Sequence, residues 1–157
     1  MDARYTLARI EIEKTNTWRS AQTAIKKIGL SGRVQRNQHG YLKINLASTK
    51  TRDLSLFSRM PIYSLNLWQT QVRNLEALKQ MPLRQLSLAY TSVSDLTPLK
   101  GRPLQSLTIA YSPIEDLTPL KGAPLIHLHL SSTKIDNLSP LKNMPLKTLH
   151  LDRTLIT

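Results

Sequence analysis

Three histidines and an aspartate lie close together near the end of the sequence. They are His127, His129, His150 and Asp152. Imidazole and carboxylate groups that converge within a few ångströms can bind zinc. The repeat described below instead places these side chains side by side on a flat strand surface, with no supporting partner evident. We therefore expect no metal and no cofactor, and we interpret the histidines as solvated side chains or as part of a pH-sensitive contact.

The sequence offers little else that is typical of an active site. It contains no cysteine, which excludes a thiol nucleophile and disulfide bonds, and it has no glycine-rich phosphate loop. Glu115 and Asp116 fall in a predicted turn, and Ser106 beside His127 has no evident acidic partner. We expect that the protein is not an enzyme.

The chain is strongly basic, with 22 lysines and arginines against 10 acidic residues and a formal net charge of +12. This charge makes nucleic acid or another polyanion the alternative partner. One position of the repeat carries lysine four times: Lys79, Lys100, Lys121 and Lys142. Because no aromatic residues alternate with these lysines as base-stacking platforms, and Asp95, Asp116 and Asp136 lie nearby to compensate them, we favour a solvated basic surface.

An internal repeat organises the chain and is clearest in two successive blocks of 21 residues. Residues 81–101 read MPLRQLSLAYTSVSDLTPLKG, and residues 102–122 read RPLQSLTIAYSPIEDLTPLKG. A fixed period in this range predicts a solenoid, whose units bury their apolar sides by stacking on one another. We divide the chain into an N-terminal cap and successive repeats: 1–38 for the cap, then 39–59, 60–80, 81–101, 102–122, 123–143 and a partial repeat 144–157.

Each repeat contains a short strand. In residues 81–101, Leu86 and Leu88 alternate with Gln85, Ser87 and Ala89. Period-two alternation of this kind predicts that the leucines face the core and the other three residues face solvent. Because the strand recurs in every repeat, we expect a parallel sheet of short strands.

The rest of each repeat is expected to form the opposite, convex side. Thr91 follows the strand, and its hydroxyl can bond backbone groups of the turn. Thr97 is predicted to cap one short 3₁₀ turn, with Pro98 in its first position and Gly101 as its stop. The predicted fold class is an α/β repeat with a sheet on one side and short 3₁₀ turns and loops on the other.

The pattern Leu83-x-x-Leu86-x-Leu88-x-x-Thr91-x-Val93 resembles the leucine-rich repeat, with threonine in place of the usual asparagine. The match covers residues 39–157, and the segment Asp-Leu-Thr-Pro-Leu-Lys-Gly is similar to short bacterial arrays of the internalin-like type. The resemblance implies a curved solenoid whose concave sheet recognises proteins or peptides.

The outward side chains of the concave sheet form the predicted partner-binding face. Trp68, Tyr90 and Tyr111 stand out, because exposed aromatic rings concentrate binding energy at protein interfaces. The alternative is that the three rings only cover the rim of the sheet. The candidate binding residues are Asn66, Trp68, Gln85, Ser87, Tyr90, Ser106, Thr108, Tyr111, His127, His129 and His150.

The N-terminal residues do not fit the repeat. An apolar stripe, with Trp18 at its start and Ile28 at its end, predicts a helix over about 17–28 that Gly29 stops. We expect this helix to cap the first repeat, since a solenoid needs its terminal core covered, although a docking arm or a remnant of another domain is the alternative. Residues 5–14 are compatible with either a strand or a helix.

Two further expectations concern the C-terminus and the cellular location. The last residues, from Leu149 to Ile156, are apolar at several positions and no polar repeat follows them, so we expect end-to-end dimerisation or a shortened version of a longer array. No stretch reaches the about 20 apolar residues of a membrane span, and the first residues lack the apolar core of a signal peptide. We therefore expect a cytoplasmic protein, with secretion open if the chain is part of a longer one.

Overall fold

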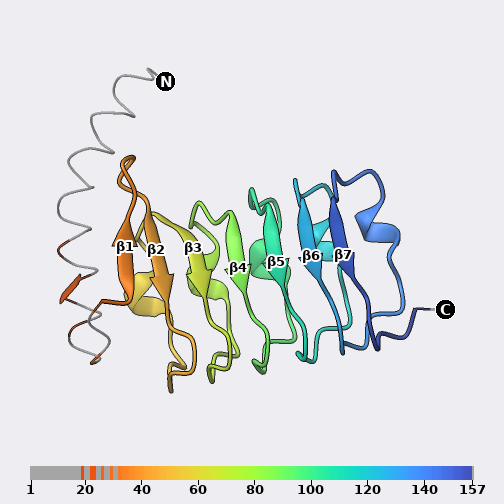
Figure 1. Cartoon of the computed structure of the whole chain (residues 1–157), viewed down its shortest axis with the longest axis horizontal. Coiled ribbons are helices and arrows are strands. Elements are labelled where there is room, and N and C mark those ends of the chain that lie inside the picture. The colour runs from red at the N-terminus through yellow and green to blue at the C-terminus, as the bar shows by residue number, and fades with distance from the viewer. Residues whose placement is uncertain (1–18, 20–21, 24–25, 27–28, 30–31, 157) are drawn as a thin grey trace.

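A single sheet runs through the computed structural model, which describes residues 19, 22–23, 26, 29 and 32–156. Its strands follow one another in chain order, as Figure 1 shows. They are β1 (Val34–Arg36), β2 (Leu42–Asn45), β3 (Ile62–Asn66), β4 (Gln85–Ser87), β5 (Ser106–Thr108), β6 (His127–His129) and β7 (Thr148–His150). The predicted helix over about 17–28 falls largely outside the described residues, as do residues 5–14, and both stay predictions.

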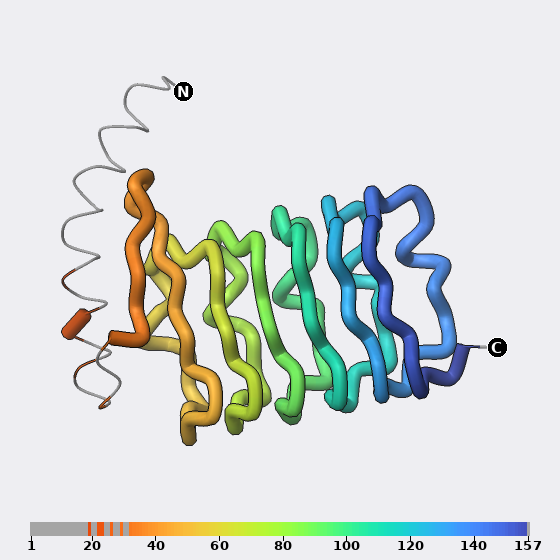
Figure 2. Tube along the Cα trace, in the orientation of Figure 1, coloured from red at the N-terminus to blue at the C-terminus, as the bar shows by residue number. Residues whose placement is uncertain are grey.

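From β2 to β7 the strands pair in parallel, and each residue meets its counterpart in the next repeat, except at Leu42 of β2, which pairs with Ile62 beside an irregularity in the register. Leu86, for example, pairs with Leu65 on one side and Leu107 on the other. Behind the sheet lie short 3₁₀ helices, so that successive coils of the chain stack on one another (Figure 2). They are η1 (Ser55–Phe57), η2 (Glu76–Leu78), η3 (Thr97–Leu99), η4 (Thr118–Leu120) and η5 (Ser139–Leu141). The parallel sheet and the 3₁₀ turns predicted from the repeat are confirmed.

The inward leucines build a continuous core between the sheet and the 3₁₀ helices. Leu86 and Leu88 are buried, as the alternation predicted. Ala89 is also buried, and the prediction that it faces solvent is wrong. The strand ends at Ser87 and the backbone turns at Tyr90, where φ is +57°, so the pleated alternation no longer applies at Ala89.

A column of buried hydroxyls secures the turn that leaves each strand. The Thr91 hydroxyl donates to the carbonyl oxygen of Leu88 over 2.7 Å, and Thr70 and Thr133 make the same bond in their own repeats. Because a buried hydroxyl without a partner is costly, these bonds explain why threonine or serine stands at this position. The structural role predicted for this column is confirmed.

The start of each 3₁₀ turn differs from the prediction. The residue before η3 is Leu96, and Thr97 makes no side-chain capping bond. Instead, the Asp95 carboxylate accepts a hydrogen bond from the Thr97 backbone N–H over 2.7 Å. An aspartate or asparagine bonds in this way two residues ahead of itself and competes well with a capping hydroxyl. Gly101 ends the turn with φ of +70°, as expected.

An antiparallel strand, β1, precedes the parallel ones and was not anticipated. Val34 pairs with Ile44 of β2, so β1 covers the edge that β2 would otherwise present. The connecting turn is held by Asn37, whose side-chain oxygen accepts from the N–H groups of His39 and Tyr41 over 3.0 and 2.9 Å. Gly40 supplies the positive φ that the turn requires, at +80°.

Toward the C-terminus the core becomes more open. Leu149 and Leu155 are exposed in the described residues, but end-to-end dimerisation stays a prediction. None of the described helices has the length and apolar character that a membrane crossing demands.

Candidate partner-binding face

The strand register brings most of the predicted binding residues into rows of direct neighbours. In one row Gln85, Ser106 and His127 pair across β4, β5 and β6. In the next row Ser87, Thr108, His129 and His150 pair across β4 to β7. Neighbouring strands stand about 4.8 Å apart, so each row is a continuous ladder of polar side chains. We call these residues, with Asn66, Trp68, Tyr90 and Tyr111, the sheet face.

Three aromatic rings lie in contact at the edge of the sheet face, and we call Trp68, Tyr90 and Tyr111 the aromatic row. Tyr90 and Tyr111 stack with ring centroids 4.3 Å apart and an interplanar angle of 11°. Trp68 meets Tyr90 edge to face at 6.0 Å and 78°. The exposed fractions of the three residues are 39%, 48% and 46%, so the rings pack on one another and still present surface to solvent.

The backbone explains why the two tyrosines stack. Tyr90 and Tyr111 both adopt the left-handed conformation, with φ of +57° and +56°, so their side chains leave the backbone in the same direction. Their N–H groups donate to Ala110 and Ser131 of the following repeats, both over 3.1 Å. These bonds help to hold a conformation that is unfavourable for residues other than glycine. Four further non-glycine residues share this position and conformation: Ser48, Gln69, Ser132 and Arg153.

The two phenols differ electrostatically. A hydrogen bond with the Ser132 side chain, and another with Tyr90, lower the pKa of Tyr111 below its usual range. Desolvation raises the pKa of Tyr90, and its hydrogen bond to Tyr111 adds to this effect. Within the aromatic row, Tyr111 is therefore the more acidic phenol.

Asn66 is engaged within the protein. Its side-chain oxygen accepts a hydrogen bond from the backbone N–H of Trp68 over 2.9 Å. Asn45 makes the same contact with Ala47 one repeat earlier, over 3.0 Å. The side-chain oxygen of Asn66 therefore positions the backbone that carries Trp68, and the side-chain NH₂ group is left to bind a partner.

The histidines do not form a metal-binding geometry. His127 Nδ1 lies 2.8 Å from the Thr148 hydroxyl, while the rings of His129 and His150 lie 4.9 Å apart with a tilt of 52°. Desolvation first and the neighbouring His150 second lower the pKa of His129, and Asp152 partly opposes them. Within the residues that the structure describes, no three histidine or acidic side chains converge on one point.

The acidic groups on the convex side contact both lysines and the backbone of the turns. Lys79 pairs with Glu76 over 2.6 Å, and Lys134 pairs with Glu115 over 3.2 Å. The carboxylates of Asp95 and Asp116 accept hydrogen bonds from the backbone N–H groups of Thr97 and Thr118. Hydrogen bonds from Thr97 lower the pKa of Asp95 most. The positive charge of Lys79 also lowers it and is the smallest contribution.

Comparison with known proteins identifies the architecture. No protein-family model matches the sequence, and no curated protein sequence is significantly similar to it. Among solved structures, an internalin (inlF) from Listeria monocytogenes superposes with a TM-score of 0.67 at 25% identity, over 71% of this chain and 34% of that one. Internalin C2 (inlC2) from the same organism superposes with a TM-score of 0.67 at 32% identity, over 69% of this chain and 50% of that one.

The chain thus spans about a third and half of the lengths of these two internalins. The likeness agrees with the parallel strands, one to a repeat, and with the short 3₁₀ helices behind them. It also agrees with the leucine spacing in the sequence. The chain is a leucine-rich-repeat protein with an internalin-like solenoid.

Proposed function

We propose that the chain is a non-catalytic protein- or peptide-binding module that uses the sheet face, with the aromatic row as its main contact. Internalin-like leucine-rich repeats are generally protein-binding, and this supports the class of partner. The observation that carries the proposal is the aromatic row itself. Three large rings that remain about half exposed are typical of a binding site, since tyrosine and tryptophan dominate the energetics of protein interfaces.

The packing of the rings strengthens this interpretation. Tyr90 and Tyr111 are held by mutual stacking and by a backbone that repeats its conformation in each coil. A side chain that is already ordered loses little conformational entropy when a partner binds. Around the rings, Gln85, Ser87 and Thr108 supply neutral hydrogen-bonding groups that suit a peptide backbone.

Selection from a random peptide library tests the proposal without a named partner. Peptides selected on the wild-type chain are measured against the triple variant Trp68→Ala/Tyr90→Ala/Tyr111→Ala by fluorescence anisotropy. We expect at least about 100-fold weaker binding, because a hot-spot residue contributes about 2 kcal/mol or more. Since the three side chains are exposed, circular dichroism of the variant should match the wild type.

The matched control is Lys100→Ala/Lys121→Ala/Lys142→Ala on the convex side, which should keep the wild-type affinity. Equal affinity of the aromatic variant and the wild type for the selected peptides would refute the assignment of the binding site. Loss of binding only in the lysine variant would point to the polyanion alternative.

A further inference from the structure

One position of the repeat changes its charge along the solenoid. In successive repeats it is occupied by Arg52, Arg73, Ser94, Glu115 and Asp136. At the acidic end, Glu115 pairs with Lys134 over 3.2 Å. At the basic end, neither arginine belongs to an ion pair within the described part of the chain, where the pairs are Lys134–Glu115 and Lys79–Glu76.

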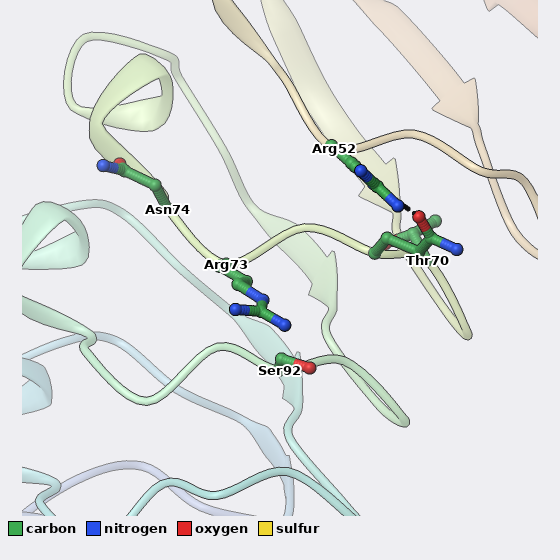
Figure 3. A pocket seen from close by; sticks show the side chains of 6 residues that line it. Arg52, Thr70, Arg73, Asn74 and Ser92 are labelled. Atoms are coloured by element: carbon green, nitrogen blue, oxygen red, sulfur yellow. Dashed lines mark hydrogen bonds between the residues drawn. The ribbon is translucent and has the colours of Figure 1, made fainter.

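The two arginines line a common shallow pocket of ≈ 640 Å³ at the turns that follow β2, β3 and β4. Its lining residues are Arg52, Thr70, Gln71, Arg73, Asn74 and Ser92. Figure 3 shows Arg73 pointing toward Ser92, whereas Arg52 lies beside Thr70. The pocket therefore gathers side chains from three repeats around two guanidinium groups.

Hydrogen bonds within the lining engage two of its side-chain acceptors. Arg52 Nε donates to Gln71 Oε1 over 2.6 Å, and the Glu76 backbone N–H donates to Asn74 Oδ1 over 2.6 Å. Both amide oxygens are thereby occupied, which leaves the amide NH₂ groups of Gln71 and Asn74 as donors. The lining contains no carboxylate. The remaining donors are the guanidinium N–H groups and the hydroxyl of Ser92, because the Thr70 hydroxyl already donates to the carbonyl oxygen of Leu67 over 2.8 Å.

The surroundings add to the positive potential of this pocket. A second pocket of ≈ 490 Å³ shares Arg52 and is also lined by Arg33 and Lys50. Its one carboxylate, Asp53, accepts hydrogen bonds from the backbone N–H and hydroxyl of Ser55 over 2.8 and 2.7 Å. With a net charge of +12 on the whole chain, this edge of the solenoid attracts anions.

We propose that the pocket between Arg52 and Arg73 binds a phosphate-type oxyanion. Guanidinium groups bind phosphate through paired N–H donors, and two of them match the double charge of a phosphate monoester better than the single charge of a carboxylate. The hydroxyl of Ser92, toward which Arg73 points in Figure 3, supplies a further donor for the remaining oxygens. The phosphate is carried either by a small molecule or by a phosphorylated side chain. This site is separate from the sheet face and does not depend on the function proposed for it.

Inorganic phosphate is the first probe. Thermal unfolding of the full chain is measured in sodium phosphate and in sodium chloride at equal ionic strength, and phosphate should raise the melting temperature because it binds the folded state. The double variant Arg52→Gln/Arg73→Gln should lose this increase. Lys121→Gln/Lys142→Gln removes the same charge outside the pocket and should retain it. No increase in the wild type, or the same increase in all three proteins, overturns the proposal.

A second measurement separates the two sources of phosphate. The affinities of a phosphoserine peptide, its unphosphorylated form and inorganic phosphate are compared by calorimetry, with the same two double variants. Tighter binding of the phosphopeptide assigns the site to a phosphorylated partner, and equal affinity of the phosphopeptide and free phosphate assigns it to a small ligand. In either case Arg52→Gln/Arg73→Gln should weaken binding at least about 10-fold. The proposed site is contradicted if a short oligonucleotide binds through Lys121 and Lys142 while Arg52→Gln/Arg73→Gln leaves the affinity for every phosphate probe unchanged.

Discussion

The rings of Tyr90 and Tyr111 stack face to face, 4.3 Å apart, although the two residues belong to different repeats. Their common left-handed backbone conformation aims both side chains in the same direction. Beyond Tyr111 the same position is occupied by Ser132, whose side chain hydrogen-bonds the Tyr111 hydroxyl. The stack is thus a consequence of the repeat, and it ends where tyrosine gives way to serine.

The first prediction concerns the ionisation of this pair. Tyr111 should lose its proton at lower pH than Tyr90, because the hydrogen bond with Ser132 lowers the pKa of Tyr111 while desolvation raises the pKa of Tyr90. The variant Ser132→Ala should raise the pKa of Tyr111. Tyrosine Cζ chemical shifts followed by NMR through about pH 10 measure both steps, with Tyr90→Phe and Tyr111→Phe for assignment.

Ser48→Ala is the matched control for that titration. It removes a hydroxyl at the same position of an earlier repeat, where Ser48 bonds Gln69 over 3.1 Å, and should leave both tyrosine titrations unchanged. A Tyr90 phenol that ionises before Tyr111 would contradict the prediction.

The second prediction concerns the acid sensitivity of the convex turns. Hydrogen bonds from the hydroxyl and backbone N–H of Thr97 and Thr118 lower the pKa values of Asp95 and Asp116. A carboxylate whose pKa is lowered by folding stabilises the fold at pH values above its unfolded-state pKa of about 3.9. This contribution is lost as the pH falls through the folded-state pKa. The double variant Asp95→Asn/Asp116→Asn should therefore keep the turns and lose less stability between pH 7 and pH 3, as measured by urea unfolding.

The chain itself contains the controls for this experiment. Asn74 and Asn137 already make the same turn, bonding Glu76 and Ser139 over 2.6 and 2.8 Å. Asn137→Asp should make the loss of stability on acidification steeper. Asn137→Ala should remove the contact and cost about 1 kcal/mol at pH 7, the usual effect of losing a capping side chain. An unchanged unfolding midpoint in Asn137→Ala would show that the turn does not need this bond.

Much of the fold could be predicted because the same pattern of core, turn and surface residues recurs in each repeat. Leu86 and Leu88 alternate with polar residues, Pro98 and Gly101 mark a short turn, and each recurs one block later. The hydroxyl bond of Thr91 to Leu88 followed from the same regularity, since a buried polar side chain must have a partner. Where the prediction failed, at Ala89, the chain had already left the strand.

The remaining features depend on signals that the sequence carries only weakly. Strand β1 has three residues and a single partly buried valine, Val34, so its alternation is too short to recognise. The turn residues Asn37 and Gly40 are the signal that could have revealed the hairpin. The left-handed position is occupied by side chains such as Tyr90 that have no preference for it. The arginine pocket was missed although Arg52 and Arg73 share one position of the repeat, and comparing charges position by position would have revealed it.

The last prediction concerns His129, which lies beside His150 with ring centroids 4.9 Å apart. Desolvation and the neighbouring imidazole lower the pKa of His129, so the folded state resists its protonation. Neutral His129 therefore contributes to the free energy of unfolding above the unfolded-state pKa of about 6.5. This contribution is lost as the pH falls through the lower folded-state pKa. The sheet face should therefore become less stable under mildly acidic conditions.

Replacing the neighbour tests this directly. His150→Gln removes one charge from the pair and should raise the pKa of His129, measured from its ring proton shift, and it should reduce the loss of stability between pH 7.5 and pH 5. His127→Gln is the control, because His127 bonds Thr148 and its ring does not belong to the pair of His129 and His150. Since Asp152 partly offsets the effect, Asp152→Asn should lower the pKa of His129 further. If His150→Gln leaves the pKa of His129 where it was, burial alone controls that histidine and the pair does not act as a pH-sensitive contact.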